Sequence, residues 1–328
     1  MKISSIGLGI LSAALLCGAA SAAETYGDGA QALPLQQSGG TARAMGMGSA
    51  VVAVDQGSAS LLWNPAGLGR MDSKEVGLHH NSGLGGTVQE ILVVGMPLGE
   101  VEEAGKGGSL GGIAASLGYV NYGSFTGADD LGQRTGSYNS GDFSGSLGWG
   151  KELLPSLSGG VVLKGNHSSF GNKTFQTYSS DLGLLWNVIP SLDLGVGYSN
   201  LQFGGGIAGA PLAAGWRLGA GWNATKHWLL AASTELQEKD AMKRVQLGTE
   251  VLIGDVEKKS NVLALRGGYQ MSFPNRELGA LAGMTLGVGY TVTRSIVLDY
   301  AMLPAGDLGA SHRLSLTFKF NSPGQKKG

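Results

Sequence analysis

Bulky apolar residues alternate with small or polar residues along most of the chain after residue 73. In residues 212–222, leucine, alanine and tryptophan occupy every second position, and glycine or Arg217 fills most positions between them. Residues 191–200, 284–292 and 311–320 repeat the scheme. A period of two places successive side chains on opposite faces of a strand. The pattern therefore predicts strands with one bulky apolar face and one face of Gly, Ser, Thr and charged residues.

This alternation divides residues 73–320 into about fourteen predicted strands. Many are near ten residues long, which is the length that a tilted strand needs to cross a bilayer. The predicted strands are 75–82, 88–97, 109–124, 138–151, 157–168, 177–187, 191–201, 212–223, 227–237, 243–253, 261–272, 283–292, 295–303 and 311–320.

The predicted connections alternate between short turns and longer polar loops. Short turns follow the fourth, sixth, eighth and twelfth strands, whereas segments 83–87 and 254–260 depart from the alternation. Outer-membrane barrels have short periplasmic turns and longer outer loops, so this order predicts an even-stranded barrel with both ends at the periplasmic side. The predicted long loops are 125–137, 169–176, 202–211, 273–282 and 304–310.

A soluble β-sandwich or a secreted β-solenoid would also show alternation. A soluble sandwich, however, buries its bulky face and exposes a charged one, whereas the second face here is mostly Gly, Ser and Thr. No predicted helix covers the bulky faces of the strands, so lipid is the partner left for them. Tryptophans near strand ends, such as Trp149, Trp186 and Trp222, suit the aromatic girdles of a membrane barrel. The sequence therefore predicts an all-β membrane protein, a single antiparallel transmembrane β-barrel.

The first residues have the features of an export signal. Lys2 is followed by the apolar stretch 6–16 and by Ala20-Ser21-Ala22, so residues 1–23 are predicted to be a cleaved signal peptide. Cys17, the one cysteine, lies inside it after the bulky Leu16, which disfavours a lipoprotein signal. Loss of Lys2 leaves 22 basic and 24 acidic side chains, a balance that does not suit a nucleic-acid partner.

Residues 24–72 lack strand alternation and are rich in Ala, Gly and Met. Residues 58–63 could form one or two helical turns, which Pro65 would end by forcing Asn64 into an extended conformation. The small residues of this segment favour close backbone packing inside a narrow barrel, which predicts a luminal hatch or plug. A periplasmic tail is the alternative that the composition leaves open.

The stretch GTARAMGMG (40–48), Asp55 and the stretch SASLLWNPAGL (58–68) resemble the start of the PorV/PorQ family of the FadL-like outer-membrane barrels. The resemblance implies a fourteen-stranded barrel whose N-terminal segment sits in the lumen as a hatch, followed by barrel residues 73–320. The hatch motif implied by the resemblance comprises Trp63, Asn64, Pro65, Ala66, Gly67 and Leu68.

The same resemblance implies two functions. FadL-like members admit hydrophobic molecules such as fatty acids and pass them sideways through the barrel wall, whereas the PorV branch shuttles exported cargo proteins. The chain is short beside the fatty-acid transporters and closer in size to the PorV branch. It also departs from barrels of this kind by continuing past Phe320 with a polar tail, residues 321–328.

The first hypothesis is therefore a Gram-negative outer-membrane barrel that passes fatty-acid-like small molecules, with membrane lipid around it. The alternative is a component of a protein secretion or surface-attachment system with cargo or secretion proteins as partners. No catalytic residues, metal site or cofactor are predicted, because none of the five histidines has an acid or a second ligand suitably placed beside it.

Charged residues on the predicted luminal face are the remaining candidates. They would form either an ion-paired network that packs the hatch or a substrate path, and the mixture of both signs favours the network. These residues are Lys164, Asp181, Arg217, Glu235, Glu250, Arg266 and Asp299.

Overall fold

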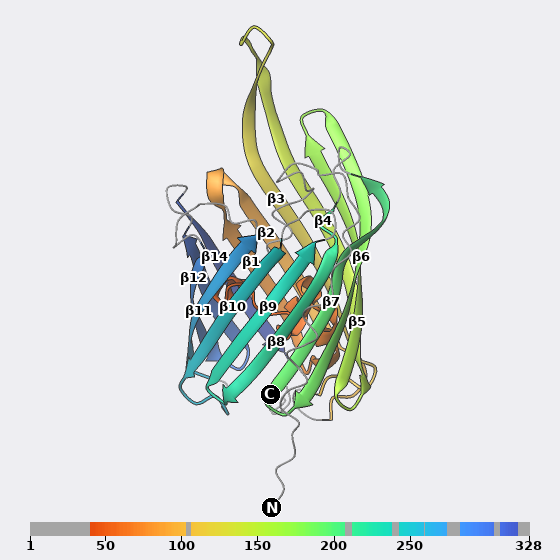
Figure 1. Cartoon of the computed structure of the whole chain (residues 1–328), viewed down its shortest axis with the longest axis vertical. Helices are drawn as coiled ribbons and strands as arrows, with labels where there is room; N and C mark the ends of the chain where they lie inside the picture. The colour runs from red at the N-terminus through yellow and green to blue at the C-terminus, as the bar shows by residue number, and fades with distance from the viewer. Residues whose placement is uncertain are drawn as a thin grey trace, which may run out of the picture.

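Fourteen antiparallel strands close into a single barrel in the computed structural model, which describes residues 40–102, 106–206, 212–237, 243–258, 260–273, 283–304 and 309–320. Each strand pairs with its neighbours in the chain, and β14 pairs back onto β1 (Figure 1). The expected signal peptide 1–23, residues 24–39 and the tail 321–328 lie outside the described residues.

The strands are β1 (Lys74–Ser82), β2 (Val88–Pro97), β3 (Gly112–Ala128), β4 (Arg134–Leu154), β5 (Leu157–Phe170), β6 (Lys173–Ile189), β7 (Leu192–Gly206), β8 (Gly215–Thr225), β9 (Trp228–Gln237), β10 (Lys243–Ile253), β11 (Val262–Phe273), β12 (Met284–Thr293), β13 (Ile296–Pro304) and β14 (Ala310–Phe320). The prediction of a closed barrel of about fourteen strands is confirmed.

The bulky face of each strand points out of the barrel, and the face of small and charged residues points in. On β8, Trp216, Leu218 and Trp222 are exposed, whereas Arg217 between them is buried. The same exposed apolar wall continues around the barrel on the other strands. Such a wall is stable only against hydrocarbon, and closure leaves no unpaired sheet edge in the bilayer, so the fold is that of a transmembrane barrel.

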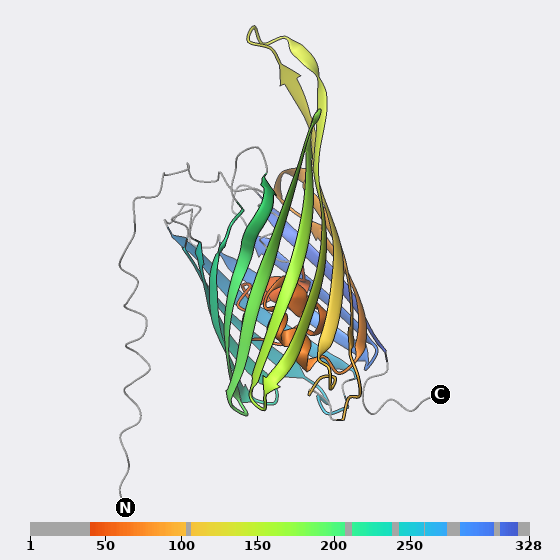
Figure 2. The ribbon, with the colours of Figure 1, turned by 90° about the vertical axis from the view of Figure 1, so that its right-hand side faces the viewer.

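Two of the predicted long loops are wrong. Residues 125–137 and 169–176 mostly continue the strands, so that β3 and β4 form a hairpin that projects well beyond the other strands (Figures 1 and 2). Its tip, residues 129–133, is held by the Asp129 carboxylate, which accepts hydrogen bonds from the N–H groups of Leu131 and Gln133. The β5–β6 hairpin turns in two residues at Gly171, whose φ of 58° suits glycine.

Residues 40–72, the luminal segment, lie inside the barrel, where Figure 2 shows them as compact red-orange turns. The segment contains α1 (Ala42–Gly46) and the 3-10 helices η2 (Gly57–Leu62) and η3 (Pro65–Arg70); η4 (Leu84–Gly86) lies between β1 and β2. The hydroxyl of Thr41 begins α1 by accepting a hydrogen bond from the N–H of Ala44. No described helix is long and apolar enough to span a bilayer.

Inward-facing glycines of the wall make room for the luminal segment. A side chain at Gly160 would overlap the backbone of Pro65, and one at Gly268 would overlap the backbone of Gly48. Glycine at these two positions therefore lets the backbones of the wall and of the luminal segment approach closely. A side chain would also meet the segment's backbone at Gly112, Gly150, Gly195, Gly219, Gly248 and Gly287, and its side chains at Gly95, Gly148 and Gly183.

Candidate functional site

The Asn-Pro turn fixes the middle of the luminal segment against the wall. Asn64 is extended, with φ −143° and ψ 103°, as expected before Pro65, and its Oδ1 accepts a hydrogen bond from the N–H of Ala66. Its Nδ2 donates to the carbonyl of Val52 in the segment and to that of Leu184 on β6. Pro65 ends one 3-10 helix and starts the next, so η3 intervenes between this turn and β1.

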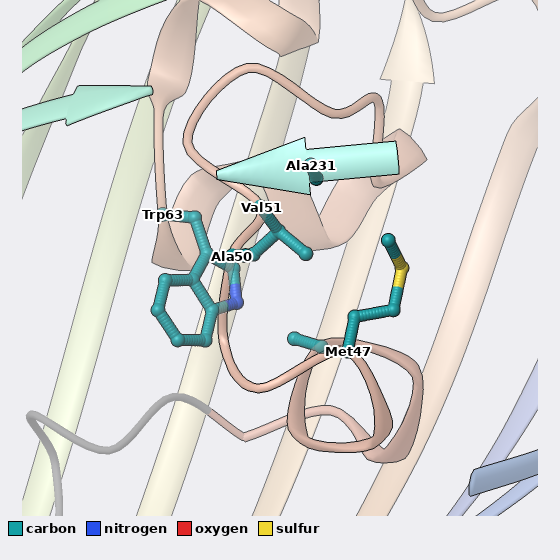
Figure 3. Close-up of a cluster of buried hydrophobic side chains, with 6 residues drawn as sticks. Met47, Ala50, Val51, Trp63 and Ala231 are labelled. Carbon is teal, nitrogen blue, oxygen red and sulfur yellow. The ribbon is translucent and has the colours of Figure 1, made fainter. Parts of the chain in front are cut away.

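Trp63 anchors the segment through an apolar cluster. Its ring is 3% exposed and packs with Met47, Ala50 and Val51 of the segment and Ala231 of β9 (Figure 3). The Arg217 guanidinium of β8 lies 5.8 Å from the ring centre and donates a hydrogen bond to the Trp63 carbonyl. A second cluster joins Leu61, Leu68 and Met71 to the opposite side of the wall through Val93, Ala114 and Val162.

A chain of buried ion pairs joins α1 to β10, β11 and β13. The Arg43 guanidinium lies 2.8 Å from Glu250, which also pairs with Arg266 at 2.6 Å. Arg266 in turn lies 2.6 Å from Asp299. Arg43 also donates a hydrogen bond to the Asp55 carbonyl, so it braces the segment internally as well as against the wall.

The remaining predicted luminal residues form two separate groups. Lys164 of β5 lies 2.5 Å from Asp181 of β6, close to the bulge at Asn200, whose N–H donates to Asp181. Arg217 and Glu235 face each other at 3.6 Å across β8 and β9. The structure thus brings the seven predicted residues into three ion-paired groups rather than one continuous path.

The luminal segment and neighbouring strands contribute further charges that the sequence pattern did not predict. Arg43 completes the group around Glu250, Arg244 pairs with Glu235 at 3.3 Å, and Arg70 of η3 pairs with Asp193 of β7 at 2.9 Å. Arg43 and Arg70 are the two basic residues of the segment, and isolated cations in an apolar stretch were the signal that could have found them.

A cavity of about 540 Å³ lies between the luminal segment and the wall formed by β1 and β10–β14. We name it the vestibule; it reaches the β10–β11 and β12–β13 turns, at the end of the barrel where the expected periplasmic turns lie. The Asp55 side chain is exposed to the vestibule, but desolvation within the barrel raises the pKa of its carboxyl above the ordinary value.

Two apolar features lie outside the lumen. An outward groove of about 720 Å³ crosses β2–β7, with Gly145 and Gly165 in its floor and Leu117, Leu147 and Leu163 among its walls. Above it, Phe125, Tyr138 and Phe170 form an exposed aromatic patch on the projecting hairpins. The rings of Phe125 and Phe170 lie 6.4 Å apart at 40°.

The aromatic patch lies on the continuation of the luminal face. Phe125 pairs with Tyr138, and Phe170 pairs with Ser140. Tyr138 and Ser140 lie four and two residues before the inward-facing Asp142 on β4. Side chains two residues apart share a face of a strand, so these aromatic rings occupy the side of the hairpins that lines the lumen lower down.

Solved structures show the same barrel. The toluene transporter TbuX of Ralstonia pickettii superimposes with a TM-score of 0.59 at 14% identity, over 86% of this chain and 99% of that one. The toluene transporter TodX of Pseudomonas putida gives 0.58 at 15% identity, over 85% and 96%. A FadL homologue of Pseudomonas aeruginosa gives 0.52 at 12%, over 86% and 98%.

The chain therefore shares its barrel fold with these three proteins. No protein-family model matches the sequence, and no curated protein matches it. Membership of the PorV/PorQ branch of the FadL-like barrels, which the motifs in residues 40–68 suggest, stays a prediction.

Proposed function

We propose that this FadL-type barrel lies in the outer membrane and admits hydrophobic small molecules of the fatty-acid or hydrocarbon class. The fold that it shares with two toluene transporters supports this class of cargo. The aromatic patch above the lumen is the observation that carries the proposal.

The patch is placed to capture apolar molecules from water. Phe125 and Phe170 are 48% and 58% exposed although they lie on the face that continues into the lumen. Exposed aromatic rings on a projecting ribbon are unfavourable in water unless they bind an apolar partner. An apolar molecule that settles on them lies at the outer end of the barrel.

The route then leads sideways rather than straight through. The luminal segment fills the barrel, and the vestibule beneath it is lined by charged side chains that disfavour an apolar molecule. The outward groove over Gly145 and Gly165 offers an apolar surface on the membrane side of the same wall. The wall between them is built from small side chains such as Ser116 and Ser146, which hydrogen-bond at 2.6 Å.

In this proposal the luminal segment acts as the hatch. Trp63 and the turn from Asn64 to Leu68 hold it against β4, β5, β6 and β9, and Arg43 holds it against β10. A small displacement of this turn from the glycine-lined wall would free the inner surface of β4 and β5 beside the groove.

The test is uptake by cells whose barrel carries Phe125→Ser and Phe170→Ser together. The loss of two aromatic contacts, each worth about 1 kcal/mol or more, is expected to reduce uptake of a labelled long-chain fatty acid or of toluene at low concentration by ~10-fold. The amount of folded barrel in the membrane is expected to stay unchanged, because both rings are solvent-exposed.

Leu131→Ser is the matched control, since Leu131 is exposed at the tip of the same hairpin but lies outside the patch. Unchanged uptake in the double variant at normal barrel levels would refute capture by the patch.

A second candidate, a component of a protein secretion or surface-attachment system, draws on the same hairpin. β3 loses its β2 partner after Asn121, so residues 122–128 present an unpaired backbone edge among the described residues. Such an edge can accept a strand from another protein. A cargo protein that is lost from the cell surface on deletion of 122–137, with uptake unchanged, would favour this candidate.

A further inference from the structure

The vestibule carries an excess of negative charge. Six carboxylates line it against four cationic side chains; the acids are Asp55, Asp72, Glu75, Glu250, Glu257 and Asp299, and the bases are Arg43, Arg266, Arg294 and Lys319. A cavity of one predominant sign, enclosed by low-dielectric walls, attracts the opposite charge.

Most of these acids have a cationic partner. Glu250 and Asp299 pair with arginines, Glu75 pairs with Lys319 at 2.8 Å, and Glu257 pairs with Lys226. Asp55 differs, because its side chain accepts a hydrogen bond from the N–H of Gly57 and has no ion pair among the described residues. The Asp55 side chain is exposed to the vestibule, so its carboxylate is accessible to a cationic partner that enters the cavity.

His79 of β1 contributes to the vestibule wall a ring nitrogen without a hydrogen-bond partner among the described residues. His79 is 5% exposed and lines the vestibule. Its Nδ1 hydrogen-bonds Ser315 at 2.8 Å, but its Nε2 has no partner within the described part of the chain. Buried polar atoms are rarely left unpaired, so this side of the vestibule is short of one hydrogen-bond partner.

The chain supplies a matching segment at the mouth of the cavity. β14 ends at Phe320, one residue after Lys319, whose side chain lines the vestibule. The sequence then continues NSPGQKKG, with Lys326 and Lys327 and no acidic residue. Six residues can extend about 20 Å, which lets Lys326 reach back into the barrel from Phe320.

We propose that the vestibule is a docking site for a lysine-bearing extended segment, and that residues 321–328 of the same chain occupy it. The ammonium of Lys326 or Lys327 pairs with the carboxylate of Asp55. Because Asp55 belongs to the luminal segment and the lysines follow β14, this contact ties the segment to the last strand from the periplasmic side. The docking does not depend on what the barrel carries.

A zero-length carbodiimide cross-linker tests the contact, because it joins a lysine directly to a carboxylate that touches it. The wild-type barrel, purified in micelles, is treated and then digested for mass spectrometry. A link from Lys326 or Lys327 to Asp55 is expected, and Asp55→Asn is expected to abolish it, since asparagine keeps the Oδ1 that caps Gly57 but cannot react. The exposed Lys226–Glu257 pair, 2.8 Å apart, is the internal positive control.

Isotope mixing separates docking within one chain from docking between copies. With equal amounts of ¹⁴N and ¹⁵N protein, the expected link joins peptides of the same label. Three results would overturn the proposal: a mixed-label link, tail lysines joined to surface acids such as Glu152, or no tail link while Lys226–Glu257 forms. Because uptake is not measured, failure here leaves the proposed transport function intact.

Discussion

Replacing Arg266 with methionine is expected to destabilise the barrel by about 3–5 kcal/mol, because it leaves a buried carboxylate without its counter-ion. Arg266 is held between Glu250 and Asp299, 2.6 Å from each. Glu250 keeps Arg43, but Asp299 has no other ion pair among the described residues. Urea unfolding of the protein refolded into lipid vesicles, followed by tryptophan fluorescence, measures the change.

A second substitution separates charge from packing. In the Arg266→Met background, Asp299→Asn removes the unpaired charge and is expected to restore part of the lost stability. Lys226→Met breaks an ion pair that is exposed on both sides and is expected to change little. If the Arg266→Met barrel unfolds at the same urea concentration as the wild type, the luminal ion pairs do not stabilise the barrel.

Trp63→Ala is expected to release the luminal segment while the strands stay closed. Truncating a buried tryptophan costs about 3–5 kcal/mol, and this ring joins Met47, Ala50 and Val51 of the segment to Ala231 of the wall. The lost free energy weakens the attachment of the segment and leaves the strand pairing intact, because Trp63 is not part of a strand. Limited trypsin digestion is expected to cut after Arg43 and Arg70 much faster than in the wild type, with heat-modifiable gel mobility retained.

Trp222→Ala is the matched control, since Trp222 faces outward on β8 and does not contact the segment. If the segment stays as protected in Trp63→Ala as in Trp222→Ala, the Trp63 cluster is not its anchor.

The period-two alternation predicted the membrane-crossing strands because lipid and lumen impose different side chains on the two faces. The predicted 88–97 and 243–253 match β2 and β10 at both ends. The same signal fails where both faces meet water. Residues 125–137 (FTGADDLGQRTGS) are mostly Gly and polar residues with no bulky residue at every second position, so β3 and β4 continue there without alternation. Their backbone ladder and a glycine-bearing turn hold them together.

The site was harder to predict than the wall. Period two places Glu250, Arg266 and Asp299 on the luminal face, but their pairing depends on the register between strands, which alternation does not fix. Arg43 meets Glu250 from 207 positions away only because the luminal segment lies against β10–β13. The effect of Pro65 on Asn64 was local and therefore predictable. The 3-10 helix η3, which begins at Pro65, was not predicted.

Uptake by cells that lack the gene tests the central claim most directly. Cells without the barrel and cells complemented with it are compared for uptake of a labelled long-chain fatty acid, with the surface proteome measured in parallel. The proposed function predicts that uptake falls without the barrel and returns on complementation, while the surface proteins stay in place. Unchanged uptake together with lost surface proteins would contradict it and assign the barrel to protein export.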